Sequence, residues 1–476
     1  MIVLINPFIS SMERYGRDIG DIGGHQMPLG IFYLAAALRK VQFSVEVIDA
    51  EAANLSHEEV VAHITQQKVS LIGLTSTTVA FRNTRLLAEM LRKALPTVPI
   101  VIGGPHMTAM PDETMQTNAF DFGVTNEGEI ALVQLARFLL QKQGTLETIP
   151  NLYYHQENSW VKSKEQSVIA ELDTIPFPAR ELYPDLTDYK PPVGSFRLRP
   201  VVNIITSRGC PYQCIFCDNN TFGRKTRFHS AEYVAREIIE TLNRFHAREI
   251  AFIDDTFVLD KQRLRRIFAL LDEKGIKFPW TCMTRVNNID YETLKFMREH
   301  GCWQIRFGIE SGNQQVLDFI KKGITLEQVC DAAHWCKELG IATVGFFMIG
   351  HHTDTKETIE ETIKFALSLP LTDTVVTINT PIPGTESYAL ARQYGQYDEG
   401  DWTSLNYWTP VFVPHGLTSE YMVEKQAELY RRFYMRPHII LGQLAKIRSV
   451  PILLMFLRNA MLGLNFLKQS ARGKSR

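Results

Sequence analysis

The sequence lacks the long uninterrupted hydrophobic run that a membrane-spanning helix requires. Its most apolar stretch, residues 451–467, is interrupted by Arg458, Asn459 and Asn465, which argues against a span of the bilayer. The first six residues are apolar but far shorter than a secretory signal and carry no basic residue, so they indicate a β-strand. The 476 residues include only seven cysteines. We expect a cytoplasmic protein. In the reducing cytoplasm, clustered cysteines bind metal or do redox chemistry more often than they form disulfides.

Acidic residues are missing from the carboxyl-terminal end of the chain. From Arg431 onward there are ten Lys and Arg and no Asp or Glu, whereas the whole chain has a net charge of −1. A nearly neutral total gives no general attraction to nucleic acid, but a segregated basic end favours an anionic partner. Two interpretations stay open for residues 451–467: a helix at an anionic membrane surface, giving peripheral membrane contact, or a helix packed on the rest of the protein.

The hydrophobic pattern predicts an α/β fold with several domains, as a length of 476 residues suggests. Over residues 1–143 strand-like runs alternate with helical patterns, which predicts a doubly wound parallel sheet. The expected strands are 2–5, 45–48, 70–74 and 99–102, and the expected helices are 29–39, 58–67, 82–95 and 129–141. Residues 144–200 are rich in proline and predict a linker with little regular structure, apart from a hairpin at 152–155 and 160–162.

The alternation returns at residue 201 and predicts a partial (β/α)6 barrel over residues 201–395, with its chemistry at the carboxyl ends of the strands. The expected strands are 202–206, 250–253, 280–283, 304–308, 343–348 and 374–378. Residues 396–476 are expected to form a mostly helical region, a helical tail that begins at about Ser419. The Tyr-, Trp- and Pro-rich residues 380–420 are candidates for a cap over the site.

Three cysteines lie on one short loop after the first strand of the expected barrel. Cys210, Cys214 and Cys217 are separated by three and then two residues. A [4Fe–4S] cluster needs a thiolate on each iron that it anchors, and three thiolates leave one iron open to a chelating ligand. A structural zinc site would need four ligands, and His229 is a lone candidate for the fourth. The other four cysteines, Cys282, Cys302, Cys330 and Cys336, show no cluster spacing and are expected to be small core residues.

This loop resembles that of the radical S-adenosylmethionine (SAM) superfamily, whose CxxxCxΦC pattern has an aromatic residue at Φ, here Phe216. The resemblance implies that the open iron binds the amino and carboxylate groups of SAM. It also implies reductive cleavage of SAM to a 5′-deoxyadenosyl radical, which takes hydrogen from an unactivated C–H bond. The electron would come from a donor such as flavodoxin or ferredoxin.

Further SAM contacts follow from the same resemblance. After the second strand the family often has Gly-Gly-Glu, and here Asp254 and Asp255 stand in its place. Arg285 follows the third strand and is expected to pair with the SAM carboxylate. Glu310 ends the fourth strand and is expected to accept hydrogen bonds from the ribose, although a barrel salt bridge or helix caps would also explain Arg285 and Glu310.

The fifth strand of the expected barrel is followed by Gly350, whose backbone is expected to face the adenine of SAM. His351 and His352 come next, where many relatives have Leu-Pro. These two histidines are the candidates for catalytic proton donors. The alternative is a pair of solvated loop histidines.

The first 143 residues carry a second set of motifs. Gly103, Gly104 and His106 follow a strand directly, and Glu127 precedes a helix. Each alone indicates only a tight turn or a helix cap. Together with the Pro-Leu-Gly that starts the first helix, they resemble the cobalamin-binding domain found before radical SAM barrels. The resemblance implies cobalamin contacts from a set of six residues: Ser76, Thr77, Gly103, Gly104, His106 and Glu127.

One cobalamin motif is absent from the sequence. Cobalamin domains of the methionine-synthase type carry Asp-x-His-x-x-Gly, whose histidine binds cobalt from below, and this sequence has no such motif. The stretch Asp21-Ile-Gly-Gly-His25 contains the same residue types, but not in the order of that motif. The lower face of the cobalt would then be water-bound, blocked by an apolar side chain, or five-coordinate. A sheet domain that binds nothing is the alternative.

The combined resemblance is to the cobalamin-binding radical SAM enzymes of the anaerobic cyclase and the hopanoid and tetrapyrrole types. It implies three cofactors: a [4Fe–4S] cluster, SAM and cobalamin. The expected reaction is methyl transfer to an unactivated carbon of a small-molecule or lipid-like substrate. Oxidative cyclisation or rearrangement without methyl transfer is the alternative enzyme activity, and a non-catalytic sensor that holds a cluster and a corrin is the alternative from another class.

Overall fold

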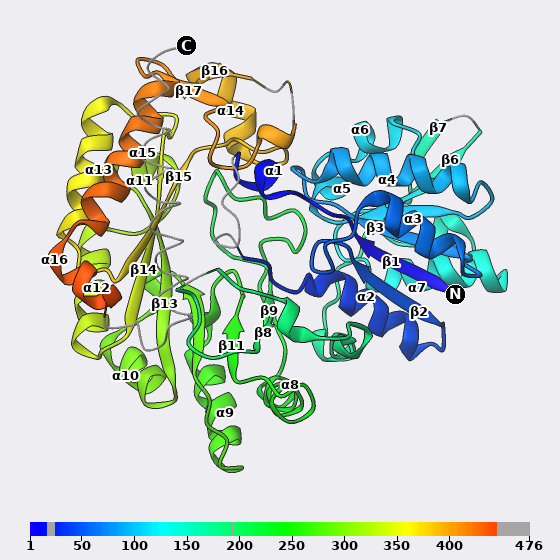
Figure 1. Cartoon of the computed structure of the whole chain (residues 1–476), viewed down its shortest axis with the longest axis horizontal. Coiled ribbons are helices and arrows are strands. Elements are labelled where there is room, and N and C mark those ends of the chain that lie inside the picture. The colour runs from blue at the N-terminus through cyan, green and yellow to red at the C-terminus, as the bar shows by residue number, and fades with distance from the viewer. Residues whose placement is uncertain (17–23, 158, 193, 399, 401, 445–476) are drawn as a thin grey trace.

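The computed structural model describes residues 1–16, 24–157, 159–192, 194–398, 400 and 402–444. Two α/β units lie side by side, one built from the blue and cyan part of the chain and the other from the green to orange part (Figure 1). Among the helices of this described part, none is both long and apolar enough to cross a membrane. Residues 451–467, for which membrane contact and packing were both open, lie outside the described residues.

The first unit is built on a seven-stranded sheet of order β2-β1-β3-β4-β5-β6-β7, in which β1 to β5 run parallel. These five strands are β1 (Ile2–Asn6), β2 (Val45–Asp49), β3 (Leu71–Thr75), β4 (Ile100–Gly103) and β5 (Phe122–Val124). Its helices are α1 (Ser11–Tyr15), α2 (Leu29–Lys40), α3 (His57–Thr65), α4 (Phe81–Ala94), α5 (Pro105–Ala109), α6 (Pro111–Gln116) and α7 (Glu129–Ala136). The doubly wound parallel sheet is confirmed, and in such sheets ligands bind beyond the carboxyl ends of the strands.

The segment expected as a linker contributes to this first unit. The predicted hairpin forms as β6 (Leu152–Gln156) and β7 (Ser159–Lys162), and β6 pairs antiparallel with β5, so the hairpin extends the sheet. Further along, Ile169, Ile175 and Tyr189 are buried in the same core as β1 and α2. The described part of residues 144–200 is therefore packed rather than loose: its apolar side chains join this core, and Arg180 also pairs with Glu237 of the second unit at 2.7 Å.

The second unit is a six-stranded parallel sheet whose strands follow one another in the order β8-β11-β12-β13-β14-β15. They are β8 (Val201–Ile204), β11 (Glu249–Phe252), β12 (Trp280–Thr284), β13 (Cys302–Glu310), β14 (Ala342–Ile349) and β15 (Asp373–Ile378). Its helices are α8 (Ala231–Arg244), α9 (Lys261–Asp272), α10 (Tyr291–Glu299), α11 (Gln314–Phe319), α12 (Leu326–Glu338) and α13 (Lys356–Ser368). The partial (β/α)6 barrel is confirmed, with β8 and β15 at its two open edges.

In the carboxyl-terminal region, which the structure describes as far as Leu444, a short strand pair precedes the helices that were expected from about Ser419. After α14 (Glu386–Tyr394) the strands β16 (Gly395–Tyr397) and β17 (Phe412–Pro414) form an antiparallel pair, and only then do α15 (Ser419–Tyr434) and α16 (Pro437–Leu444) follow. The segment between β16 and β17 reaches the first unit, where Trp402 packs on Phe81 with ring centroids 5.4 Å apart. The predicted cap region thus ties the two units together.

The four cysteines outside the cluster loop behave largely as small core residues. Cys282, Cys302 and Cys336 are fully buried, and Cys330 is half-buried on α12. These four cysteines pack in the core between the sheet and its helices, as expected.

Candidate functional site

The cysteine loop is closed at its base by a short antiparallel pair. Strand β9 (Ser207–Arg208) pairs with β10 (Arg227–Phe228), and Cys210, Cys214 and Cys217 lie between them. Gly209 has φ +89°, and a Cβ there would lie 2.6 Å from the backbone oxygen of Lys225. Only glycine fits this turn without strain, so the residue before Cys210 sets how the loop leaves the barrel.

The three thiols face groups that suit an iron–sulfur cluster. Cys214 and Cys217 line a cavity of about 200 Å³ that also reaches Arg224. Nη1 of Arg285 lies 3.4 Å from Sγ of Cys214, and its guanidinium stacks on Tyr212 at 3.7 Å from the ring centroid. A fixed cation beside a thiolate offsets part of the negative charge that a cluster brings.

The described residues do not form a site for a single metal ion. In the part of the chain that the structure describes, no three His, Cys, Asp or Glu side chains are placed to hold one metal ion. Thiolates that each bind a different iron of a cluster need not converge on one ion. His229, the candidate fourth zinc ligand, stacks on Tyr233 at 3.9 Å and contacts Asp173 through Nδ1.

Beside the cysteines lies a buried ion pair that joins two parts of the fourth barrel unit. Nζ of Lys322 donates to Oε1 of Glu310 at 2.7 Å, and both side chains are at most 10% exposed. Nζ of Lys322 also lies 5.6 Å from the ring centroid of Phe216. Glu310 has φ +68°, a conformation that costs a non-glycine residue about 1–3 kcal/mol. Strain of this kind at the end of β13 is typical of a functional position.

The two candidate histidines are both buried, so the interpretation as solvated loop residues is wrong. His351 is 1% exposed and lies near Phe216, with 6.1 Å between the ring centroids. Burial, together with the nearby His352 and Lys322, lowers the pKa of His351 to about 3, so this ring is neutral at pH 7. His352 packs on Phe412 and contacts the backbone oxygen of Ser387 at 3.0 Å through Nε2, which makes it part of the core.

The two aspartates after β11 play different parts. Asp254 is fully buried, and its Oδ1 accepts hydrogen bonds from the backbone nitrogen and hydroxyl of Thr206, at 3.0 and 2.8 Å. This carboxylate was expected at SAM, and the structure instead uses Oδ1 to fix the chain that enters the cysteine loop. Asp255 is exposed and lines the cavity between the two units.

A large cavity separates the carboxyl edge of the first sheet from the barrel. It has a volume of about 620 Å³. From the first unit it is lined by Gly30, Gly73, Gly103 and Gly104, and from the second by Ile205 and Asp255. Gly104 has φ +96°, and a Cβ there would lie 2.7 Å from Oγ1 of Thr75. Glycines along this edge let a broad planar ligand approach the backbone closely, which suits a corrin ring.

Of the six residues expected to contact cobalamin, three line this cavity and three do not. Gly103, Gly104 and Glu127 line it. Ser76 is buried and accepts a hydrogen bond from the Thr84 hydroxyl at 3.0 Å, and Thr77 is exposed beside it. His106 is fully buried, with its ring 4.1 Å from Phe81 and 4.7 Å from Trp402. Aromatic packing thus encloses His106, which is not among the residues that line this cavity.

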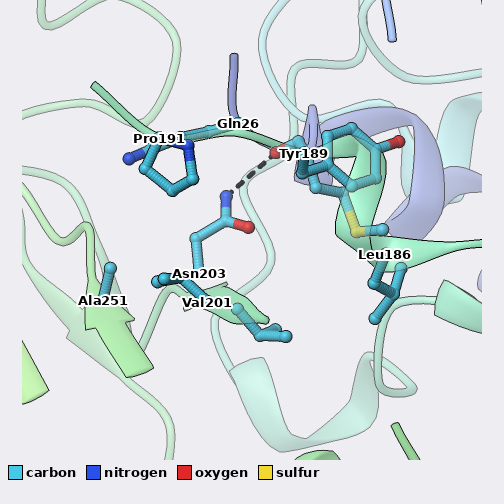
Figure 2. Close-up of a pocket in the computed structure, with 9 residues that line it drawn as sticks. Gln26, Leu186, Tyr189, Pro191, Val201, Asn203 and Ala251 are labelled. Atoms are coloured by element: carbon cyan, nitrogen blue, oxygen red, sulfur yellow. Dashed lines mark hydrogen bonds between the residues drawn. The ribbon is translucent and has the colours of Figure 1, made fainter. Parts of the chain in front are cut away.

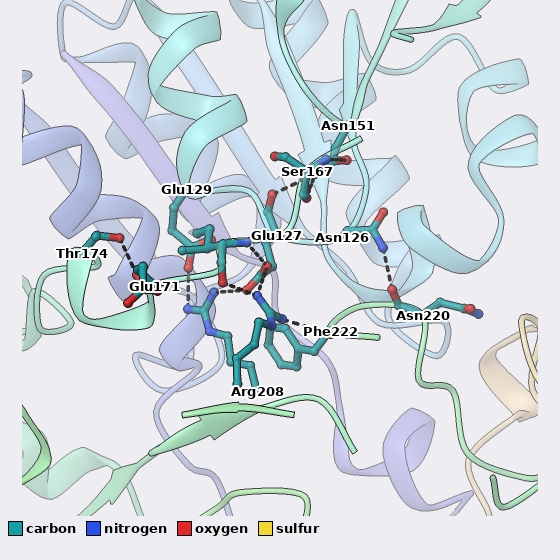
Figure 3. Close-up of polar contacts among 12 residues, drawn as sticks. Asn126, Glu127, Glu129, Asn151, Ser167, Glu171, Thr174, Arg208, Asn220 and Phe222 are labelled. Atoms are coloured by element: carbon teal, nitrogen blue, oxygen red, sulfur yellow. Dashed lines mark hydrogen bonds and ion pairs between the residues drawn. The ribbon is translucent and has the colours of Figure 1, made fainter. Parts of the chain in front are cut away.

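Glu127 has a partner that the sequence did not reveal. Nη1 of Arg208 donates to its Oε1 at 2.7 Å, and Nη1 of Arg227 donates to its Oε2 at 2.7 Å (Figure 3). Nη2 of Arg208 also donates to Glu129 at 2.6 Å. Because Arg208 and Arg227 are register partners at the base of the cysteine loop, one carboxylate of the first unit holds both ends of that loop.

A second contact joins the units near the amino end of α2. Figure 2 shows Asn203 of β8, whose Nδ2 donates to the backbone oxygen of Met27 at 2.9 Å. The pocket around it, lined also by Tyr189 and Pro191, has a volume of only about 10 Å³, enough for a single water. This place is therefore a joint between the units rather than a ligand site.

His25 is tied to carboxylates on both ring nitrogens. Nε2 lies 3.1 Å from Oδ2 of Asp49 and Nδ1 lies 3.1 Å from Oε1 of Glu51. Burial lowers the pKa of His25, but the two carboxylates outweigh burial and raise it to about 9. A histidine held as an imidazolium has no lone pair for cobalt, which agrees with the absence of a lower-ligand motif.

Comparisons with known proteins match both halves of the chain. The B12 binding domain family matches residues 18–136 and the radical SAM superfamily matches residues 204–366. An uncharacterised methyltransferase of Pyrococcus horikoshii is 32% identical over 443 residues, which is 93% of this chain and 94% of that protein. An anaerobic magnesium-protoporphyrin IX monomethyl ester cyclase of Cereibacter sphaeroides is 26% identical, over 91% of this chain and 70% of that protein.

Solved structures share the whole fold. The radical SAM methyltransferase TsrM from Kitasatospora setae, with cobalamin and a [4Fe–4S] cluster bound, gives a TM-score of 0.70 at 17% identity and covers 100% of this chain and 99% of its own. The cobalamin-dependent SAM radical enzyme OxsB gives 0.73 at 16% identity, over 97% of this chain and 71% of its own. Both likenesses concern the arrangement of the two units.

Proposed function

Since this chain belongs to the cobalamin-binding radical SAM enzymes, we propose that it methylates an unactivated carbon atom of a small molecule. Its cofactors are a [4Fe–4S] cluster, SAM and cobalamin. When bound, the cluster with SAM supplies a carbon radical and cobalamin supplies a methyl group. The observation that carries the proposal is the contact of Glu127 with Arg208 and Arg227, which holds the cysteine loop against the unit with the 620 Å³ cavity.

The residues around the cysteines would hold SAM and keep water away from it. We assign Arg285 to the carboxylate of SAM, because its guanidinium already lies beside Cys214. Glu310 and Lys322 would contact the polar groups of the nucleoside, and Phe216 and Gly350 would border it. Gly103, Gly104 and Asp255 would lie along the corrin, since they line the cavity from both sides.

His351 is the residue that we assign to proton exchange near the reacting carbon. Its Nε2 is buried and has no hydrogen-bond partner among the described residues. A buried polar atom without a partner costs about 1–3 kcal/mol, so a ligand that satisfies it would be favoured. The neutral ring would offer this nitrogen for a hydrogen bond rather than donate from an imidazolium.

Oxidative cyclisation is the second candidate reaction, because magnesium-protoporphyrin cyclases are among the relatives of this chain. The two reactions differ in what they make from SAM. We would incubate the reduced holoenzyme with SAM labelled with ¹³C in its methyl group and an extract of small molecules from the source organism. Methylation predicts a ¹³C-labelled product with equal amounts of S-adenosylhomocysteine and 5′-deoxyadenosine. Cyclisation would give 5′-deoxyadenosine alone, and a sensor protein would give neither.

The electron that starts the reaction has to come from another protein. We propose a small acidic donor of the flavodoxin or ferredoxin kind. Arg224 and Lys225 lie exposed on the cysteine loop, and Arg224 borders the cavity at Cys217. Basic side chains beside the cluster would attract an acidic partner and speed its encounter. Reduction of the cluster should slow with rising salt, and an Arg224→Glu, Lys225→Glu double variant should be reduced more slowly.

The basic carboxyl-terminal end supports peripheral contact with the cytoplasmic face of a membrane, and with it a lipid-like substrate. This end contains no acidic residue after Arg431. Basic residues near anionic lipids contribute about 1 kcal/mol each. Sedimentation with vesicles of phosphatidylglycerol and phosphatidylcholine tests the contact: the full chain should bind the anionic vesicles and a variant truncated after residue 444 should not.

A further inference from the structure

The fourth barrel strand presents a distinct row of side chains to the inside of the barrel. On β13, Ile305, Phe307 and Ile309 are buried in the core between the sheet and its helices. Successive side chains of a strand alternate between its two faces. The residues between these three, and those on either side, therefore face inward. From the amino end, that inner row is Gln304, Arg306, Gly308 and Glu310.

Contacts at both ends of the row agree with this placement. Nε2 of Gln304 donates to the backbone oxygen of Gly194 at 3.0 Å, where the linker closes the amino end of the barrel. At the other end, Glu310 pairs with Lys322 next to the cysteine loop. The row therefore leads from the closed floor of the barrel to the region assigned to SAM.

Arg306 is a half-buried cation with no ion-pair partner among the described residues. Its Nη2 lies 3.3 Å from the backbone oxygen of Ser195 and 3.4 Å from Oε1 of Gln304, both long for a charged hydrogen bond. Among the described residues, no carboxylate oxygen lies within 4.0 Å of its guanidinium nitrogens. A guanidinium that is partly removed from water gains from a carboxylate or phosphate partner, and among the described residues Arg306 has none.

The nearest acidic groups are used elsewhere. Oε2 of Glu249 accepts from the backbone nitrogens of Arg197 and Leu198, and its Oε1 accepts from the indole of Trp303 at 3.0 Å. Asp373 accepts from its neighbour Thr374 at 2.8 Å and from the hydroxyl of Tyr434. Neither carboxylate neutralises Arg306 directly.

An apolar surface surrounds Arg306 on the same inner face. In register, Arg306 lies between Met283 on β12 and Val344 on β14. One step toward the SAM region, Gly308 lies beside Phe346, and Phe346 lies beside Val375 on β15. Met283, Phe346 and Val375 are only half-buried, whereas the residues that alternate with them are buried. The inner face around Arg306 is thus half-buried and largely apolar, with Asp373 two strands away in the same register row.

Gly308 makes room for the ion pair of Glu310 and Lys322. A Cβ at this position would lie 2.6 Å from Oε1 of Glu310 and 2.7 Å from Nζ of Lys322. Any side chain here would displace that ion pair. Arg306 and Glu310 are four positions apart on the strand, which is about 13 Å at about 3.3 Å per residue.

We propose that the inside of the barrel binds a substrate with an apolar body and one oxyanion group, a carboxylate or a phosphoryl group, which pairs with Arg306. The proposal rests on the proposed function, since it places the substrate of that reaction. The apolar body lies along Met283, Phe346 and Val375. The carbon that reacts is then on the order of 13 Å from the acidic group, because the SAM region begins at Glu310, that far up the strand. The planar fork of a guanidinium matches the two oxygens of such a group.

A matched pair of fluorescent probes tests the proposal without the natural substrate. 8-Anilinonaphthalene-1-sulfonate has an aromatic body and an oxyanion, and N-phenyl-1-naphthylamine has the same body without the charge. We would titrate both into the holoenzyme and into Arg306→Gln, Arg306→Lys and the control Arg265→Gln, whose guanidinium lies outside the barrel over Phe296. Arg306→Gln should weaken binding of the sulfonate at least tenfold and change that of the neutral probe less than twofold. Arg306→Lys should restore most of the affinity.

Competition then identifies the oxyanion. Displacement of the sulfonate by 1-naphthoate or by 1-naphthyl phosphate supports the proposal. The better competitor shows whether the substrate carries a carboxylate or a phosphoryl group. An unchanged ratio of the two probe affinities in Arg306→Gln, or displacement by neither competitor, would overturn it. Formation of 5′-deoxyadenosine from SAM in the absence of substrate should stay at the wild-type level in the control Arg265→Gln. If the wild-type protein itself formed no 5′-deoxyadenosine, that result would count against the proposed function instead.

Discussion

Arg208 of the cysteine loop and Glu127 of the first unit form an ion pair of 2.7 Å whose two side chains are only 3% and 1% exposed. The pair joins the residue two positions before Cys210 to the start of α7, which borders the large cavity. A charge pair this deeply buried is costly to break, because either partner left alone would be a desolvated charge. It therefore fixes how the two cofactor regions face each other.

Replacing Glu127 with Gln should destabilise the protein by about 3–5 kcal/mol, since it leaves Arg208 and Arg227 without their shared counter-charge. Urea unfolding of the variant and the parent measures the loss. Glu89→Gln is the matched control, because its pair with Arg85 is about 45% exposed on each side and is expected to matter by less than about 0.5 kcal/mol. Equal losses of unfolding free energy in the two variants would argue that the contact of Glu127 with Arg208 and Arg227 does not hold the cysteine loop in place.

Cys214→Ala should remove the visible absorbance of the cluster and all formation of 5′-deoxyadenosine, because the remaining two thiolates do not anchor a [4Fe–4S] cluster at three irons. Anaerobic reconstitution followed by iron and sulfide analysis gives the cluster content. Cys330→Ala is the control: that thiol is half-buried on α12, and its loss should leave both properties intact. Retained SAM cleavage in Cys214→Ala would mean that the cluster ligands have been misassigned.

Arg285→Gln should raise the Kd for SAM by at least about tenfold, which is the loss expected for one charge-assisted contact of about 1.5–3 kcal/mol. Binding is measured by the change in the electron paramagnetic resonance spectrum of the reduced cluster on adding SAM. Arg285→Lys should retain part of the affinity, since it keeps the charge but not the planar fork. SAM binding that is unaltered in Arg285→Gln would assign this guanidinium to the structure of the loop alone.

The stability of the protein should fall between pH 6.5 and about pH 9 because of His25. Its pKa is about 9 in the folded protein against 6.5 for an ordinary histidine. The stabilisation is complete below pH 6.5 and is lost as the pH rises through the folded-state value, by about 2–3 kcal/mol. The difference in unfolding free energy between wild type and His25→Gln should shrink over this range. The exposed His63, paired with Glu46, is the control position. A difference in unfolding free energy between wild type and His25→Gln that does not change with pH would contradict a raised pKa of His25.

The parts of the fold that rest on periodicity were predictable. All strands of the two parallel sheets except β5, and the start of α15 at Ser419, follow from apolar runs and caps that are local in sequence; β5, with three residues, was missed. The hairpin of β6 and β7 was predicted as well, but not its place in the first sheet. Which edge a hairpin joins depends on a distant partner, here β5, and no local pattern encodes that choice.

The site was predictable where a spacing carries the chemistry and not where distant residues meet. The cysteine spacing and the positions of Arg285 and Glu310 at strand ends were visible in the sequence. Lys322, Arg208 and Arg227 were missed, because nothing near them in sequence shows that they pair with Glu310 or Glu127. His106 was expected at the ligand because it follows two glycines, yet Phe81 and Trp402 enclose it.

The products that the purified protein makes from SAM test the central claim most directly. The protein would be prepared without oxygen, supplied with iron, sulfide and cobalamin, reduced, and incubated with SAM. We predict both S-adenosylhomocysteine and 5′-deoxyadenosine, the first dependent on added cobalamin and the second on the three loop cysteines. Protein that retains only zinc or no metal, and releases neither product, would contradict the assignment of this chain's chemistry.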